Sequence, residues 1–291
     1  MKVSEIYGFL PLYKQKGVSS NQEIQALRKR LGLKKVGHTG TLDPLAEGVL
    51  PVLVNKATRT MRFFLEYSKS YRFTVQFGIS TDTLDITGRV VFKTSRKVAR
   101  EEIEGILRDF CGEQVQVTPD FSARKYRGRS LYSYARKGIS VPKPERMIKI
   151  YRLMLTGFDF PFAQFEMDCS SGTYVRKLIE DMCLKLNVSG TMQSLVRTSC
   201  GIFNTANTKR QEEMSLSDIV PVQDVFSDYG RFDINDRFFN SASNGSPVLM
   251  EDIQEISWGE FRRYFGYSKG EIIGIYRRDG DVFRPEVILF G

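Results

Sequence analysis

The chain has 291 residues, and its 41% hydrophobic content argues against intrinsic disorder and suits one large domain plus a small one. It carries 43 basic and 34 acidic residues, a formal net charge of +9. A single histidine excludes a histidine-based metal cluster. The sequence has no apolar run of about 18 residues and no signal-type N-terminal segment, so we expect a soluble cytoplasmic protein without membrane contact.

The first elements that we expect are a strand and a helix. Residues 6–10 read as a strand. Residues 20–23, Ser-Asn-Gln-Glu, form a capping-box pattern that begins at Ser20, and apolar residues follow at helical spacing until Gly32. This helix would deliver the chain into the loop that follows.

The loop at residues 37–51 holds the candidate catalytic carboxylate. Asp43 precedes a proline, which disfavours helix, and the Gly- and Thr-rich loop presents its side chain. An Asp-Pro pair in such a loop is also typical of a plain turn, and His38 is equally typical of a structural hydrogen-bonding residue. The Gly-x-x-x-x-Gly-Lys-Ser/Thr spacing is absent, which excludes that type of phosphate-binding loop.

Two later segments alternate apolar and polar residues and predict strands with one buried face. The first runs from Tyr71 to Ile79, with Tyr71 at its start. The second covers residues 164–169 and changes to helical spacing at Val175.

Arg176 therefore falls in the first turn of a helix just after a strand. From there its guanidinium can reach a loop carboxylate, where it would keep Asp43 ionised and oriented. The alternative for Arg176 is an ordinary surface cation, and Tyr174 taken alone is typical of core packing.

One window holds almost all of the excess positive charge. Residues 122–149 contain one acidic residue, with three tyrosines among nine basic residues. The basic residues are Arg124, Lys125, Arg127, Arg129, Arg136, Lys137, Lys143, Arg146 and Lys149. Cations interleaved with aromatic rings suit phosphate contacts and stacking on unpaired bases, so we expect a nucleic-acid partner. A solvated basic face is the alternative. Glycines and prolines in the window favour a mobile arm.

The remaining signals concern cysteines and the C-terminal region. The four cysteines form no Cys-x-x-Cys pair, so we expect reduced, mostly buried thiols. From residue 231 onward, short strands at 272–276 and 287–290 with a hairpin turn at 277–281 predict a small, mostly β domain. We expect Trp258 to anchor its core.

Five motifs in order resemble those of the bacterial-type TruB family, the tRNA pseudouridine-55 synthases. They are Gly37-His38-Thr39-Gly40-Thr41-Leu42-Asp43-Pro44 with its continuation to Pro51, Lys69-Ser70-Tyr71, residues 78–88, Cys169-Ser170-Ser171-Gly172-Thr173-Tyr174-Val175-Arg176, and Leu195-Val196-Arg197-Thr198. Residues 119–149 resemble the RNA-clasping insert of the family. The chain departs from the family at Gln15, where Lys-Pro is usual, at 119–123 and at 190–192.

The resemblance implies an α+β pseudouridine synthase fold, in which a mixed or antiparallel sheet is flanked by helices. A catalytic domain at 1–230 would include the insert at about 119–149, and residues 231–291 would form a PUA-like domain. The implied reaction isomerises uridine 55 of the tRNA T-loop after base flipping and consumes no cofactor or metal.

The resemblance also assigns roles. Asp43, Tyr71 and Arg176 would be catalytic, while the RNA would be bound by His38, Lys69, Tyr174, Leu195, Arg124, Lys125, Arg129 and Arg136. The partner would be the T-arm stem-loop of tRNA, and the protein would act as a monomer without an obligate protein partner. A tRNA-folding chaperone without catalysis is the alternative function, because it would need the same basic arm.

Overall fold

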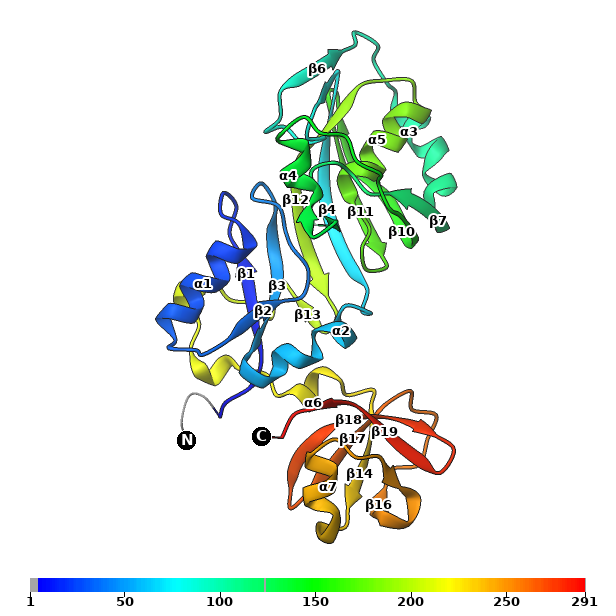
Figure 1. The fold of residues 1–291 in the computed structure, drawn as a ribbon. Coiled ribbons are helices and arrows are strands. Elements are labelled where there is room, and N and C mark those ends of the chain that lie inside the picture. Colours follow the sequence, from blue (N-terminus) through cyan, green and yellow to red (C-terminus); the bar gives the residue numbers. More distant parts are fainter. Residues whose placement is uncertain (1–4, 123, 291) are drawn as a thin grey trace.

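A large mixed sheet, whose strands lie between Gly8 and Asn204 in the sequence, organises the first part of the chain (Figure 1). The computed structural model describes residues 5–122 and 124–290. The sheet has nine strands, with β2 added beside β3 and β13 beside β12: in spatial order β1 (Gly8–Lys14), β3 (Glu47–Val54), β12 (Gly190–Cys200), β4 (Lys69–Phe77), β11 (Phe162–Cys169), β10 (Glu145–Asp159) and β7 (Gly112–Val117), plus β2 (Val36–His38) and β13 (Phe203–Asn204). The expected mixed sheet is confirmed.

The pairing of β3 with β12 is a seam in this sheet. It is the only parallel pair in the sheet as described, and its register joins just Val196 to Glu47 and Arg197 to Gly48. The other neighbours pair antiparallel, and those from β1 to β7 in the spatial order do so over longer stretches. The loop that carries Asp43 runs directly into β3, so the chain brings it to the seam.

The helices are short, and α5 and α3 lie against the part of the sheet beyond the seam, where they contact β12 and β10 (Figure 1). The α-helices are α1 (Ser20–Arg30), α2 (Met61–Phe64), α3 (Arg100–Leu107), α4 (Leu131–Ala135), α5 (Val175–Lys185), α6 (Val222–Val225) and α7 (Phe239–Ser243). Six 3-10 helices link them: η1 (Asn55–Thr60), η2 (Arg108–Phe110), η3 (Gln211–Glu213), η4 (Leu216–Asp218), η5 (Asp236–Phe238) and η6 (Met250–Asp252). In the described part of the chain, no helix is long and apolar enough to cross a membrane.

The two alternating segments form the expected strands. Along β4 every second residue is buried, from Lys69 and Tyr71 to Phe77. The strand ends before Gly78, whose φ of +94° departs from extended backbone, so Ile79 begins a separate hairpin of β5 (Ile79–Thr81) and β6 (Val90–Lys93). The switch from β11 to α5 is also confirmed, and it places Arg176 in the first turn.

The N-terminal elements differ from expectation in detail. The first strand covers Gly8–Lys14 instead of residues 6–10. The capping box of α1 uses Ser19 with Gln22, and not Ser20. The Ser20 hydroxyl instead accepts from the backbone N–H of Leu42 at 2.9 Å and donates to the Leu42 carbonyl at 2.8 Å. It therefore fixes the residue that precedes Asp43.

The basic insert lies between β7 and β10. It contains the hairpin of β8 (Lys125–Tyr126) and β9 (Arg129–Ser130), followed by α4. Residues 145–149, which we expected to belong to it, form the first part of β10 and pair with β7. Because residues 145–149 are paired with β7, they belong to the sheet, and the insert ends at residue 144.

A second, six-stranded sheet forms the C-terminal β domain (Figure 1). Its spatial order is β15 (Val248–Leu249), β19 (Val282–Ile288), β18 (Glu271–Asp279), β17 (Tyr264–Ser268), β14 (Gly230–Ile234) and β16 (Ile253–Ile256). The hairpin of β18 and β19 is confirmed, and its strands are longer than the sequence indicated. Trp258 is not a core anchor: 69% of it is exposed, and Arg278 lies over its ring.

An aromatic cluster joins the two parts of the chain. Phe226 is fully buried and packs against Phe9 and Phe64 from the first part, while Phe265 and Leu289 enter the same cluster from the second sheet. Beside it, the side chain of Arg263 bonds to Glu66 at 3.1 Å and Glu286 at 2.7 Å. The contact is therefore largely apolar, with one ion-pair network.

Truncation in this cluster tests its contribution to stability. Phe226→Ala leaves a cavity among closely packed rings, so we expect it to lower the free energy of unfolding by about 3–5 kcal/mol. Trp258→Ala removes a side chain that is 69% exposed, and we expect a change within about 0.5 kcal/mol. Urea unfolding followed by far-UV circular dichroism measures both, because Trp258 is the only tryptophan and its loss abolishes a fluorescence signal. Equal losses in the two variants would contradict this packing.

Candidate active site

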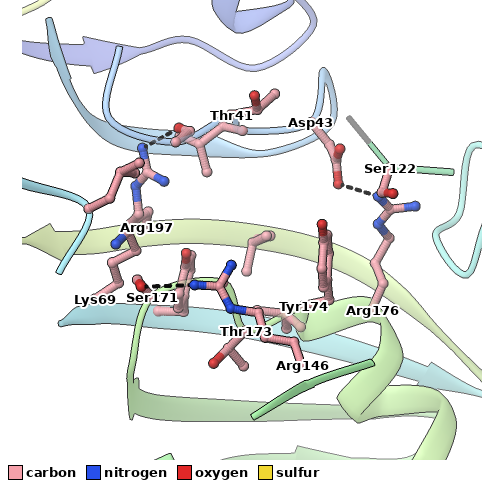
Figure 2. Close-up of a pocket in the computed structure, with 17 residues that line it drawn as sticks. Thr41, Asp43, Lys69, Ser122, Arg146, Ser171, Thr173, Tyr174, Arg176 and Arg197 are labelled. Carbon is pink, nitrogen blue, oxygen red and sulfur yellow. Dashed lines mark hydrogen bonds and ion pairs between the residues drawn. The ribbon is translucent and has the colours of Figure 1, made fainter. Parts of the chain in front are cut away.

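A cavity of about 260 Å³ opens where the Asp43 loop, β4, β12 and the start of α5 meet (Figure 2). Six of the expected site residues line it: Asp43, Lys69, Tyr71, Tyr174, Arg176 and Leu195. Figure 2 shows Asp43 and Arg176 at one end of the cavity and Lys69 and Arg197 at the other. Its size is near the lower end for small-ligand sites, which suits a single ring system.

Asp43 and Arg176 form the ion pair that the sequence suggested. Arg176 Nη2 lies 2.9 Å from Asp43 Oδ2, and only 6% of the arginine side chain is exposed against 35% of the aspartate. The same guanidinium donates to the carbonyl of Thr83 at 2.9 Å and to that of Phe121 at 2.7 Å. Arg176 thus connects the Asp43 loop to the turn after β5 and to the insert.

Burial raises the pKa of the Asp43 carboxyl above its ordinary value, and the nearby charge of Asp85 adds to this effect. The Arg176 guanidinium acts in the opposite direction, through its charge and its hydrogen bond. The carboxylate is therefore partly desolvated but stays oriented, which makes it a stronger base than an exposed aspartate.

Arg197 supports the Asp43 loop through hydrogen bonds to its backbone and to the start of β3. It is 1% exposed, and it donates from Nε to the carbonyl of Val49 at 2.6 Å and from Nη2 to the carbonyl of Gly40 at 3.2 Å. Gly48 has a φ of +109°, and a Cβ there would lie 2.3 Å from the Arg197 carbonyl oxygen. The two glycines that flank Asp43 therefore pack directly on this one residue.

A buried lysine, Lys14, forms a further hydrogen bond to the loop, after Asp43. Lys14 is fully buried and donates from Nζ to the carbonyl of Ala46 at 2.6 Å. Burial lowers its pKa to about 8, although the charges of Glu23, Asp43 and Glu47 act against this shift. With the Ser20 hydroxyl at Leu42, the loop is held at residues on both sides of the carboxylate.

Tyr71 and Lys69 come from β4 and form the floor of the cavity. Burial raises the pKa of Tyr71 well above its usual range, so the side chain is a neutral phenol. Lys69 is 4% exposed, donates to the carbonyl of Tyr67 at 3.1 Å, and has a pKa lowered by burial. Leu195 pairs with Phe73 across β12 and β4, which turns its side chain to the same cavity.

A family assignment follows from the sequence that builds this site. Residues 28–175, more than half of the chain, match the family model for the N-terminal domain of TruB family pseudouridylate synthases. The chain belongs to the TruB family. It is 36% identical to tRNA pseudouridine synthase B of Caldicellulosiruptor saccharolyticus, over 95% of this chain and 96% of the relative. It is 37% identical to the protein of that name from Caldanaerobacter subterraneus subsp. tengcongensis, over 96% and 98%.

Solved structures show the same fold. The TM-score is 0.74, with 21% identity, to a chain of a Cbf5-Nop10-Gar1 complex, covering 100% of this chain and 88% of the other. It is 0.73, also with 21% identity, to a chain of an H/ACA RNP bound to a substrate RNA containing 2′-deoxyuridine, covering 99% and 86%. The pseudouridine synthase fold expected for a TruB family member, with its C-terminal β domain, is thereby confirmed.

Five of the expected RNA-binding residues do not line the cavity. His38 lies on β2, where burial and the charge of Arg197 lower its pKa, and its buried Nδ1 has no hydrogen-bond partner among the described residues. Four exposed cations of the insert lie outside the cavity as well: Arg124, Lys125, Arg129 and Arg136. Arg124 borders a second depression, which shares Tyr174 and Arg146 with the cavity. Their roles in this TruB family member stay predictions.

Several residues that line the cavity were not predicted from the sequence, above all Arg197, Arg146 and Ser122. Arg197 stood in the quoted Leu-x-Arg-Thr motif, but arginines are usually exposed, and nothing local marks this one as buried. Arg146 was one of nine cations in the basic window. The pairing of β10 with β7 and the contact of its guanidinium with Ser171 in the turn before α5 place it at the cavity.

Replacement of Arg197 tests whether it supports the loop. Arg197→Met keeps an apolar stem but leaves the carbonyls of Val49 and Gly40 without this donor, so we expect unfolding free energy to fall by about 2–4 kcal/mol. Arg152→Met is the control, because Arg152 is exposed and pairs with Asp168; we expect a change within about 1 kcal/mol. Urea unfolding measures both. A loss no larger than that of the control would show that the loop does not need Arg197.

The pKa of Asp43 tests the electrostatics of the site. We expect the side-chain carboxyl, followed by carbon-13 NMR during a pH titration, to titrate above the ordinary value of 3.8. Arg176→Gln removes the cation that opposes this shift, so the Asp43 pKa should rise further. Arg152→Gln removes an exposed cation elsewhere and should leave it unchanged. A lower Asp43 pKa in Arg176→Gln would contradict the ion pair.

Proposed function

We propose that this protein is a tRNA pseudouridine synthase that converts uridine 55 in the T-loop of tRNA to pseudouridine. Family membership and the shared name of its relatives support the substrate class. One geometric observation carries the proposal: the partly desolvated carboxylate of Asp43 is held by Arg176 at the wall of a cavity that also contains Tyr71.

The proposed reaction is an isomerisation in which every atom is retained. The N1–C1′ bond breaks, the uracil rotates, a C5–C1′ bond forms, and the C5 proton leaves while N1 gains one. Asp43 promotes the first step, by attack on C6, by attack on C1′ or by removal of a sugar proton. Each route needs the ionised carboxylate that Arg176 stabilises, and none consumes a cofactor.

The cavity walls would keep the detached uracil in place. Tyr71 offers an aromatic face for stacking, and Leu195 on the neighbouring strand adds apolar surface to the same cavity. Because burial keeps Tyr71 a neutral phenol, stacking is favoured over a role as a phenolate base for the C5 proton. Lys69 donates to a backbone carbonyl and would support the pocket without reacting.

The insert would hold the RNA from which the uridine is flipped. Everting a base costs a few kcal/mol that other contacts must offset. The exposed cations of the β8–β9 hairpin and α4 suit phosphate contacts, and Tyr126 and Tyr132 each have an arginine over the ring. We assign the catalytic unit to residues 1–230 and a PUA-like RNA-binding unit to 231–291, acting as a cytoplasmic monomer.

Removal of the carboxylate tests the function. Asp43→Asn keeps the size of the side chain but abolishes its charge, so we expect pseudouridine formation in a T-arm hairpin to fall by at least about a thousandfold. Affinity for the hairpin should change by only a few fold, since the insert is untouched. Mass-spectrometric mapping of pseudouridine and a binding titration measure the two quantities. Unchanged conversion would refute the role of Asp43, and a wild-type protein that binds without converting would favour the tRNA-folding chaperone.

A further inference from the structure

We propose that Arg146 binds a backbone phosphate of the everted nucleotide at the mouth of the Asp43 cavity. This inference rests on the proposed function, because it concerns how the same site holds its RNA. It gives one cation of the basic window a specific partner. The other cations of the window would contact the RNA away from the cavity.

Arg146 is an exposed cation without an acidic partner. No carboxylate lies within 4.0 Å of its guanidinium in residues 5–122 and 124–290. Other cations of β10 are neutralised: Lys149 lies 3.3 Å from Glu113, and Arg152 lies 2.7 Å from Asp168. A guanidinium that faces solvent at the rim of a cavity without a counterion is available to an anion from outside.

The turn before α5 leaves space for this guanidinium. Arg146 Nη2 lies 3.4 Å from the Ser171 hydroxyl, a contact drawn in Figure 2. A Cβ at Gly172, whose φ is +83°, would lie 2.2 Å from Arg146 Cζ. The guanidinium therefore occupies the position that a side chain at residue 172 would take, which holds it against the cavity rim.

The other cations of the cavity are already engaged or enclosed. Arg176 pairs with Asp43, while Lys69 and Arg197 are at most 4% exposed and donate to backbone carbonyls. Among the described cavity-lining cations, Arg146 alone is exposed.

The chemistry of an everted nucleotide places a phosphate at this rim. Its base and sugar must enter the cavity to reach Asp43, but both phosphates remain joined to RNA outside. Arg146 also borders the neighbouring depression, together with Arg124 and Tyr174, so it stands between the cavity and the insert. A phosphate at that point would meet a planar fork of donors suited to bidentate contact.

Single-phosphate neutralisation tests the contact. T-arm hairpins carry one methylphosphonate at the 5′ or 3′ linkage of the target uridine, with a 2′-O-methyl group on the sugar preceding that linkage. Matched hairpins carry the same sugar and a normal phosphate. We expect the modification at one of the two linkages to lower wild-type kcat/KM by about tenfold or more, as for loss of a charge-assisted hydrogen bond.

On the matched hairpin with a normal phosphate, the kcat/KM of Arg146→Gln should fall below the wild-type value by about the same factor. Neutralising the sensitive linkage should not lower the kcat/KM of this variant any further. For Arg146→Gln, the slope of log affinity against log salt concentration should also be smaller in magnitude by roughly 0.7, the value for one phosphate contact on a single strand. Arg152→Gln, which removes an ion-paired cation of the same strand, should behave like wild type.

Two outcomes overturn the inference in distinguishable ways. If Arg146→Gln is as sensitive to each methylphosphonate as wild type, Arg146 does not bind these phosphates, although the proposed function stands. If wild type forms no pseudouridine in an all-RNA hairpin with normal phosphates, the proposed function fails and the inference fails with it.

Discussion

The burial of cations around the Asp43 loop is the constraint on which the site depends. Lys14, Lys69 and Arg197 are each at most 4% exposed, and within the described ranges none of them makes an ion pair. Transfer of a charge out of water costs several kcal/mol unless polar partners replace the lost hydration. Here the partners are backbone carbonyls, mostly those of the loop and its flanking strand. Loop and cations thus require each other, which fixes the position of the carboxylate between them.

Arg176 extends this constraint to the rest of the molecule. Its guanidinium bonds the Asp43 carboxylate and the carbonyls of Thr83 and Phe121, three segments that are far apart in sequence. Because these contacts use three of the five N–H donors of one planar group, a shift of any segment changes the geometry available to the others. The insert, on which the RNA contacts are proposed, is therefore attached to the same side chain that orients the carboxylate.

The features of the fold and of the site that could be predicted from the sequence are those determined by residues close together along the chain. The period change from β11 to α5 located Arg176, and the reach of a guanidinium then suggested its ion pair with Asp43. The role of Ser20 could not be predicted in this way. The sequence allows either Ser19 or Ser20 to cap the helix, and only the fold brings Leu42 to the Ser20 hydroxyl. Burial of Arg197 and exposure of Trp258 reverse the usual preferences of their residue types. Arg197 is buried where it donates to the carbonyls of Gly40 and Val49, which are distant in sequence.

The raised pKa of Asp43 also bears on whether the site is built for chemistry or for binding alone. A carboxyl whose folded-state pKa exceeds its unfolded value favours the protonated form in the fold. Its contribution to stability is present below the unfolded pKa and is lost as pH rises through the folded one, so ionised Asp43 lowers stability at neutral pH. The same charge repels RNA phosphates. A protein that only bound RNA would be more stable and bind more tightly without it, whereas a bond-rearranging enzyme needs this partly desolvated carboxylate.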